Sequence, residues 1–306
     1  MKRAKSVRIE GAITAMVTPF TESGELDVEG MKRNVEFQIA NGISGLVPLG
    51  TTGESPTVSD EERETVIRTV VEAAAGKVPV IVGTGTNSTE HSIELSQQAE
   101  ELGADAVLVV SPYYNKPTQE GLYRHFKAIA EAVSIPVVVY NIQGRTSVNI
   151  ETAALARMAQ SCSNIVAVKE ASGNVAQMMD VLDQLPKAFS VVSGDDNLTL
   201  PLMSLGGRGV ISVVSNLIPR KVSDMCAAGL RGDFATARKL HFEMLPLFKA
   251  AFIETNPIPI KTAMNMAGLA AGPVRMPLCE MQSANVEKLR AVLQKMGVLK
   301  AATATV

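Results

Sequence analysis

Short apolar runs alternate with amphipathic segments along much of the chain. The runs are rich in Val and Ile, a pattern typical of strands that are buried on both faces. They recur about every 20 to 35 residues, which is the length of one βα unit. Eight strands are therefore expected, at residues 13–18, 45–50, 78–83, 106–111, 136–141, 165–169, 189–194 and 209–213.

The segments between these strands have the periodicity of helices. One of them begins with a capping box, formed by Ser59 and Glu62, ahead of an apolar stripe. After residue 231 the strand pattern stops, and further helices are expected at residues 234–252, 260–267 and 286–296. We predict an α/β chain with a (β/α)8 TIM barrel in residues 1–231 and a small α-helical C-terminal domain in residues 232–306.

An open, doubly wound sheet is the competing architecture for alternating strands and helices. Such sheets usually carry a nucleotide-binding loop between a strand and the next helix. Neither G-x-G-x-x-G nor G-x-x-x-x-G-K-[ST] occurs in this sequence, which favours the closed barrel.

Composition narrows the class of protein. The chain has 306 residues, 46% of them hydrophobic, and a formal net charge of −2, so neither nucleic acid nor a membrane surface is an expected partner. No apolar stretch approaches the ~20 residues needed to span a bilayer, and the N-terminus does not resemble a secretory signal. Three cysteines lack metal-ligand spacing. These features predict a globular protein of the cytoplasm.

Polar and specific motifs follow the predicted strands, at the end of the barrel where active sites lie. The strands at 45–50, 106–111, 136–141, 165–169 and 189–194 lead into PLGTTGES, SPYYNKP, YNIQGRT, KEASG and SGDDN. Lys169 stands out, because it closes an apolar strand. Desolvation at a dry barrel mouth would favour a neutral amine, which is a nucleophile toward carbonyl groups. A rim lysine that reaches water is the alternative, which the polar neighbouring strand ends make less attractive.

Other strand ends offer groups that suit such a nucleophile. Tyr140 ends its strand near the same mouth and can move protons during imine chemistry, although a tyrosine that caps the core is a common alternative. The turn GTTGE at residues 50–54 can hold a carboxylate through backbone N–H groups, and its Thr51 can relay a proton, but Gly-Thr turns are often only turns. Arg145 suits a second carboxylate, and in isolation it is equally well read as a surface arginine.

Metal and phosphate chemistry fit the sequence less well. The three histidines are scattered and share no ligand-like spacing. Asp195 and Asp196 can hold a divalent ion, but a metal-dependent aldolase would bring histidines as well, so no metal site is expected. The same two acids would repel phosphate at the loop where barrels often bind it.

Taken together, GTTGE, SPYYNKP, the strand-5 motif YN followed by GRT, VKEASG, SGDD and GVISV in this order resemble the dihydrodipicolinate synthase family. This family belongs to the pyruvate-dependent class I aldolases, which include N-acetylneuraminate lyase. The resemblance spans nearly the whole chain and is specific. It implies condensation of pyruvate with L-aspartate-4-semialdehyde through a lysine Schiff base, giving 4-hydroxy-tetrahydrodipicolinate for lysine and diaminopimelate biosynthesis.

The resemblance also implies roles for individual residues. Lys169 would form the Schiff base, and Tyr140, Thr51 and Tyr114 would form a proton relay, with Tyr114 reaching into a neighbouring subunit. The residues implied to bind substrates are Thr52 (pyruvate carboxylate), Arg145 (semialdehyde carboxylate), and Gly194 and Ile211 (pyruvate pocket). Ser55, Asn87, His91 and Tyr113 match positions of a lysine-effector site in regulated members. The family implies no metal or organic cofactor and a homotetramer built as a dimer of dimers.

Two positions depart from the family pattern. Gln143 replaces the usual proline before Arg145, which would leave that side chain less preorganised for the second substrate. His91 stands where regulated members carry an acidic residue, so we expect weak inhibition by lysine or none.

Two other functions are weighed against the synthase. A lyase for a sugar acid, such as N-acetylneuraminate or 2-keto-3-deoxygluconate, would use the same Schiff base, but a polyol chain needs hydroxyl partners where Arg145 stands. A catalytically silent barrel that binds a keto acid would have no need of Lys169, Tyr140, Thr51 and Tyr114 together.

Overall fold

The structure is a computed structural model that describes residues 7–299. Eight parallel strands form one sheet, in the order β2-β1-β8-β7-β6-β5-β4-β3. A further parallel bridge between Leu46 and Val80 joins β2 to the start of β3 and closes the sheet into a barrel. The strands are β1 (Gly11–Ala15), β2 (Gly45–Val47), β3 (Ile81–Gly83), β4 (Ala106–Val110), β5 (Val137–Asn141), β6 (Ile165–Glu170), β7 (Ser190–Ser193) and β8 (Gly209–Ser212).

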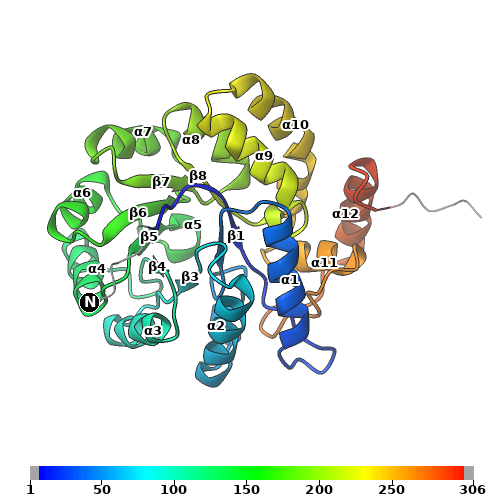
Figure 1. Cartoon of the computed structure of the whole chain (residues 1–306), viewed down its shortest axis with the longest axis horizontal. Coiled ribbons are helices and arrows are strands. Elements are labelled where there is room, and N and C mark those ends of the chain that lie inside the picture. The colour runs from blue at the N-terminus through cyan, green and yellow to red at the C-terminus, as the bar shows by residue number, and fades with distance from the viewer. Residues whose placement is uncertain (1–6, 300–306) are drawn as a thin grey trace, which may run out of the picture.

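Helices surround these strands in an outer ring, so the predicted (β/α)8 TIM barrel is confirmed (Figure 1). The helices of the ring are α1 (Val28–Ala40), α2 (Asp60–Ala74), α3 (Thr89–Glu101), α4 (Gln119–Ala132), α6 (Thr152–Ser161), α7 (Val175–Gln184), α8 (Thr199–Ser204) and α9 (Pro219–Leu230). The short helix α5 (Gln143–Thr146) follows β5 and lies inside this ring (Figure 1). The predicted capping box is present, because the Ser59 side chain accepts from Glu62 N while Glu62 accepts from Ser59 N.

Strand ends differ from the predicted ones where backbone groups have other partners. β3 begins at Ile81 rather than at residue 78, since Pro79 has no N–H to donate and its carbonyl instead accepts from Leu46 N. β1 ends at Ala15, and Met16 N makes a last bond to β2, at Val47 O. The next residues bond to other partners: Val17 N donates to Asn216 Oδ1, and Thr18 Oγ1 donates to Gly53 O at 2.7 Å.

Two apolar layers explain why near-continuous apolar strands are needed. Alternate side chains point into the barrel, where Ile13, Val138 and Ile211 belong to one buried cluster. The others point outward and pack against the helices in a second, larger cluster. A strand buried on both faces cannot alternate between apolar and polar residues, which is why its pattern is continuous.

Three helices follow the barrel, and no strand occurs between residue 213 and residue 299. They are α10 (Phe234–Ala250), α11 (Ile258–Met266) and α12 (Ser283–Lys295). Their apolar side chains, such as Phe248 and Leu289, belong to the same buried cluster as the outer face of the barrel. The domain boundary at residue 231 stays a prediction, since this packing is continuous across it.

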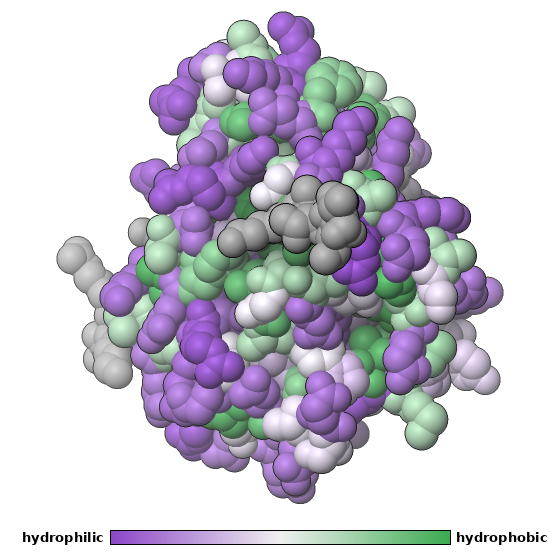
Figure 2. Space-filling model, turned by 90° about the vertical axis from the view of Figure 1, so that its right-hand side faces the viewer, coloured by the Kyte–Doolittle hydropathy of each residue, from purple (hydrophilic) through white to green (hydrophobic). Residues whose placement is uncertain are grey.

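The face that carries α11 and α12 is mostly hydrophilic, with apolar side chains between the polar ones (Figure 2). Within residues 7–299, no helix combines the length and the hydropathy needed to cross a membrane.

His125 in α4 makes stability depend on pH. Its side chain is 4% exposed, Nδ1 lies 2.9 Å from Thr89 Oγ1, and Nε2 has no partner within residues 7–299. Burial lowers the pKa of His125 to about 4. In the unfolded chain the histidine takes up a proton near pH 6.5, whereas in the folded protein it does so only near pH 4. The stability that neutral His125 contributes is therefore complete above pH 6.5 and is lost as the pH falls toward 4. We expect a loss of about 3 kcal/mol.

Urea unfolding at several pH values between 7.5 and 4 measures this loss. The His125→Gln variant should lack it, so the difference in unfolding free energy between the two proteins should shrink as the pH falls. Parallel curves for wild type and variant would contradict the prediction. His91→Gln, at a partly exposed histidine, is the matched control and should follow the wild type.

Candidate active site

Lys169 lies inside the mouth of the barrel. In β6 the side chains of Ala167 and Lys169 share a face, and Ala167 belongs to the cluster that fills the barrel. Tyr140 of β5 is the register partner of Lys169, and Lys169 Nζ lies 4.1 Å from the centroid of the Tyr140 ring. Lys169 and Tyr140 are each 5% exposed. The structure therefore brings the predicted nucleophile and the predicted proton-transfer group together in a largely dry site.

Gly194, directly after β7, lies against the stem of the same lysine, and Ile211 lies one strand further on. A Cβ atom on Gly194 would lie 3.1 Å from Lys169 Cε and 2.6 Å from Ala171 Cβ, closer than side-chain atoms normally approach. Ile211 of β8 is fully buried in the cluster that also contains Tyr140. The lysine stem thus passes over a position where only glycine leaves room.

We expect Gly194→Ala to lower kcat by at least about tenfold, because the added methyl group displaces the reactive amine or Ala171. Steady-state kinetics with both substrates measure the effect. Gly144→Ala is the matched control, since a Cβ there meets nothing within 4 Å. Equal rates for the two variants would contradict this account of Gly194.

Two acidic residues near Lys169, Asp195 and Glu170, have raised pKa values. Burial raises the pKa of Asp195, while the charge of Lys169 acts in the opposite direction. Burial also raises the pKa of Glu170, which accepts hydrogen bonds from Ser172 N at 2.7 Å and from Asn141.

Asp196 serves the structure of the loop after β7. Ser212 Oγ donates to Asp196 Oδ1 at 2.5 Å, and the backbone N–H groups of Val213 and Val214 donate to Oδ2. These bonds tie the end of β7 to the end of β8. No group of three or more His, Cys, Asp or Glu residues suited to a metal ion occurs in the described part of the chain.

The GTTGE turn is held from several sides. Glu54 has a left-handed backbone with φ of 53°, and the Gly53 carbonyl accepts from Thr18. The hydroxyl of Thr52 is buried and accepts from Asn256 Nδ2 at 3.0 Å. Thr51 lines an open cavity beside the turn. The turn therefore presents Thr51 to ligands, while Thr52 is oriented by a residue from the C-terminal segment.

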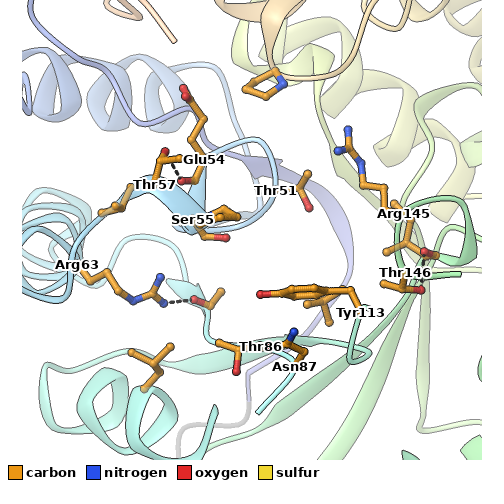
Figure 3. Close-up of a pocket in the computed structure, with 18 of the residues that line it drawn as sticks. Thr51, Glu54, Ser55, Thr57, Arg63, Thr86, Asn87, Tyr113, Arg145 and Thr146 are labelled. Atoms are coloured by element: carbon orange, nitrogen blue, oxygen red, sulfur yellow. Dashed lines mark hydrogen bonds between the residues drawn. The ribbon is translucent and has the colours of Figure 1, made fainter. Parts of the chain in front are cut away.

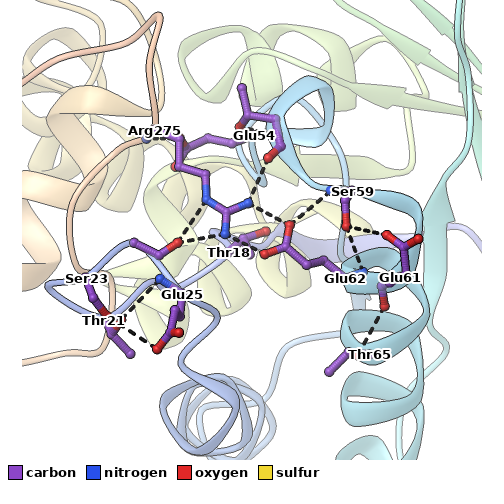
Figure 4. A network of polar contacts seen from close by, with 12 residues as sticks. Thr18, Thr21, Ser23, Glu25, Glu54, Ser59, Glu61, Glu62, Thr65 and Arg275 are labelled. Atoms are coloured by element: carbon purple, nitrogen blue, oxygen red, sulfur yellow. Dashed lines mark hydrogen bonds and ion pairs between the residues drawn. The ribbon is translucent and has the colours of Figure 1, made fainter.

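A buried ion pair fixes the end of this turn. Lys261 Nζ of α11 lies 2.8 Å from Glu54 Oε1, and each side chain is 2% exposed. The same ammonium donates to the carbonyls of Thr18 and Pro273, so all three of its N–H groups have acceptors. The second carboxylate oxygen accepts from Arg275 N, and the Arg275 guanidinium forms an ion pair with Glu62 in α2 (Figure 4).

A cavity of about 630 Å³ lies beside the turn (Figure 3). The predicted site residues that line it are Thr51, Arg145, Ser55, Asn87, His91 and Tyr113. Lys169, Tyr140, Gly194, Ile211 and Thr52 do not line this cavity and lie deeper in the barrel mouth. Tyr114 is 90% exposed, with φ of 71°, and contributes to neither group within one chain. No hydrogen bond joins the side-chain hydroxyls of Tyr140, Thr51 and Tyr114 within residues 7–299.

Arg145 is oriented without the proline that the family pattern would supply. Gln143 is the first residue of α5, a helix of four residues, and Arg145 lies in its last turn. Arg145 Nη2 donates to Asn256 O at 2.9 Å. Asn256 thus contacts Thr52 through its side chain and Arg145 through its carbonyl group.

Sequence reasoning assigned no role to Asn256, Lys261 or Arg63. The stretch NPIPIK carried a signal for one of them, since Lys261 follows apolar residues as Lys169 does. Arg63 of α2 gave no signal, because an arginine among charged residues in an amphipathic helix is usually solvated.

Comparisons with known proteins show the family of the chain. The model of the dihydrodipicolinate synthetase family matches residues 8–296. A 4-hydroxy-tetrahydrodipicolinate synthase from Nitratidesulfovibrio vulgaris is 51% identical over 293 residues, covering 96% of this chain and 100% of the relative. One from Methanocaldococcus jannaschii is 50% identical and covers 95% and 99%. The crystal structure of dihydrodipicolinate synthase from Aquifex aeolicus has a TM-score of 0.93 at 49% identity, covering 96% of this chain and 100% of that one.

Proposed function

The chain belongs to the dihydrodipicolinate synthetase family, and we propose that it is a 4-hydroxy-tetrahydrodipicolinate synthase that joins pyruvate to L-aspartate-4-semialdehyde. The observation that carries the proposal is the amine of Lys169 against the ring of Tyr140, inside a closed barrel. An amine at such a site reacts with a ketone, and a phenol beside it can exchange protons with the intermediates.

The reaction follows from these groups. Lys169 Nζ adds to the keto carbon of pyruvate, water leaves, and the imine loses a methyl proton to give an enamine. The enamine carbon attacks the aldehyde carbon of the second substrate. The amino group of that substrate then displaces Lys169 by transimination, which closes the ring and frees the lysine. The protonated imine accepts the electrons, so the chemistry needs no further cofactor.

Residues around Lys169 and the cavity are assigned roles in substrate binding and proton transfer. Thr52, with its hydroxyl held by Asn256, is suited to the pyruvate carboxylate. Arg145, oriented by the Asn256 carbonyl, faces the cavity and is suited to the carboxylate of the semialdehyde. Thr51, which lines the cavity beside the turn, is proposed to relay protons between Tyr140 and solvent. Gly194 and Ile211 shape the pyruvate pocket.

Association of subunits would complete the proposed proton relay, because it would bring Tyr114 of a second copy to the active site. Tyr114 projects from a loop after β4 and is too exposed to serve the site of its own chain. A left-handed backbone at a residue other than glycine is strained, and such strain is usually kept for a function. We place Tyr114 in the active site of a second copy, within a homotetramer built as a dimer of dimers. Sedimentation analysis of the wild type and the Tyr114→Phe variant shows whether the Tyr114 hydroxyl is needed for assembly or only for catalysis.

The test is reduction with borohydride in the presence of pyruvate, followed by peptide mapping. A pyruvyl adduct on Lys169 is expected, and its absence would contradict the Schiff base. Product formation from L-aspartate-4-semialdehyde, beside N-acetylneuraminate and 2-keto-3-deoxygluconate, then separates the synthase from a sugar-acid lyase. The synthase reaction should exceed both cleavages, because Arg145 offers a cation where a polyol needs hydroxyl partners.

The cavity end formed by Ser55, Asn87, His91 and Tyr113 is proposed as the counterpart of a lysine-effector site. His91 Nδ1 lies 3.3 Å from Glu94 Oε2, so its nearest acidic partner is already engaged. None of these four residues is an acid that could receive the ammonium group of a lysine. We expect weak inhibition by lysine, and strong inhibition at millimolar lysine would overturn the expectation.

A further inference from the structure

Asn256 is a buried side chain in the segment between α10 and α11, and it is 4% exposed. Its Nδ2 donates to Thr52 Oγ1 at 3.0 Å, and the hydroxyl of Thr52 forms no other hydrogen bond within residues 7–299. Its Oδ1 is buried and has no partner among the described residues. A buried amide oxygen without a donor costs free energy that the fold does not offset, so the placement of this side chain points to a function.

The amide group of Asn256 restricts the direction of the Thr52 proton. A hydroxyl group has one proton and two lone pairs, whereas an amide nitrogen only donates. Because Thr52 Oγ1 accepts the bond from Asn256, its own proton cannot point at that amide. Thr52 is 2% exposed, so bulk water has little access to this proton. The hydroxyl is left as a donor for a ligand, and an anionic oxygen is its strongest acceptor.

The backbone of Asn256 orients a second donor. Its carbonyl oxygen accepts from Arg145 Nη2 at 2.9 Å, and Arg145 lines the cavity beside the turn (Figure 3). Thr52 follows β2 and Arg145 follows β5, so a residue from outside the eight strands holds one donor from each of two distant strand ends. The side chain of Asn256 serves Thr52 and its main chain serves Arg145, so a substitution separates the two contacts.

We propose that Asn256 is a positioning residue that makes the Thr52 hydroxyl a hydrogen-bond donor to the carboxylate of the keto-acid substrate. The proposal rests on the proposed function, whose account of pyruvate binding it deepens. Removal of the amide lets the Thr52 hydroxyl rotate away from the substrate. An aspartate of the same shape accepts the Thr52 proton, which turns it away from the substrate, and its charge repels the substrate carboxylate.

Borohydride trapping of the full chain at increasing pyruvate concentrations tests the proposal without the second substrate. Mass spectrometry of the intact chain measures the fraction that carries the pyruvyl adduct. Asn256→Ala should raise the pyruvate concentration for half-maximal trapping by at least about fivefold, and Asn256→Asp by at least about tenfold. Asn174→Asp is the matched control, because Asn174 is exposed and caps α7, as an aspartate also does. It should stay within about twofold of the wild type.

A double-mutant cycle separates positioning from general damage to the site. In a Thr52→Val background, Asn256→Ala should change the half-maximal pyruvate concentration by no more than about twofold, because the amide acts through a hydroxyl that is no longer present. Asn256→Ala also keeps the carbonyl group that contacts Arg145. In steady-state assays the KM for pyruvate should therefore rise, while the KM for the semialdehyde stays within about threefold.

Three results would overturn the proposal. They are trapping by Asn256→Asp at the wild-type pyruvate concentration, a full additional loss from Asn256→Ala in the Thr52→Val background, and a parallel rise of both KM values. If Asn256→Ala does not fold, the comparison of Asn256→Asp with Asn174→Asp decides. Failure of the proposed reaction would show separately, as a wild-type chain that forms no pyruvyl adduct, and this role of Asn256 would fall with it.

Discussion

Lys169→Ala should abolish the condensation, with kcat lowered by about 10⁴-fold or more, because no other amine lies beside Tyr140 in the described barrel mouth. Lys169→Arg should be equally inactive, since a guanidinium keeps the charge but does not form an imine. Both variants should lose the pyruvyl adduct after borohydride reduction. Initial rates and mass spectrometry of the intact chain measure the two effects.

Lys77→Ala is the matched control for this prediction. Lys77 precedes β3, at the opposite end of the barrel, and is exposed. Its loss should leave both rate and adduct unchanged. Retention of more than about 1% of the wild-type kcat in Lys169→Ala would show that another group carries the covalent step.

Lys261→Met should destabilise the fold by about 3 to 5 kcal/mol, because it leaves the Glu54 carboxylate buried without its cation. The methionine fills similar space, so the loss reports the uncompensated charge rather than a cavity. Activity should fall as well, since Glu54 ends the turn that carries Thr51 and Thr52. Urea unfolding at neutral pH measures the stability, and assays under folding conditions measure the rate.

Two further variants separate charge from packing at this pair. Glu54→Gln combined with Lys261→Met removes both charges and should recover part of the lost stability. Lys32→Met removes an exposed partner of Glu29 and should leave the unfolding transition unchanged. A single Lys261→Met variant as stable as the Lys32→Met control would contradict the prediction, because the buried ion pair would then contribute little to stability.

The barrel was predictable because its signal is local and repeated. Each strand is an apolar run whose neighbours lie one βα unit away, so errors in one boundary do not alter the topology. The placement of Lys169 was predictable for the same reason, since alternation along β6 fixes which side chains face inward. The register of Tyr140 against Lys169 then follows from two neighbouring strands.

Contacts between distant segments were not predictable in this way. Lys261 and Glu54 are 207 residues apart, and nothing in either local pattern names the other. Asn256 lies in a loop whose sequence predicts only a break between helices, and its contacts with Thr52 and Arg145 depend on how α11 docks. Arg63 has the sequence context of a solvated helix residue, and its burial depends on the cavity that α2 and the neighbouring loops enclose.

The fixing of the GTTGE turn by residues 256–275 has a consequence for the order of events during synthesis. The turn emerges from the ribosome early, whereas Asn256, Lys261 and Arg275 are among the last parts of the chain to appear. Chains grow from the N-terminus, so the eight strands are available for pairing while Glu54 still lacks its cation. Until the C-terminal helices arrive, a nascent barrel holds its reactive lysine but has an unfinished substrate turn.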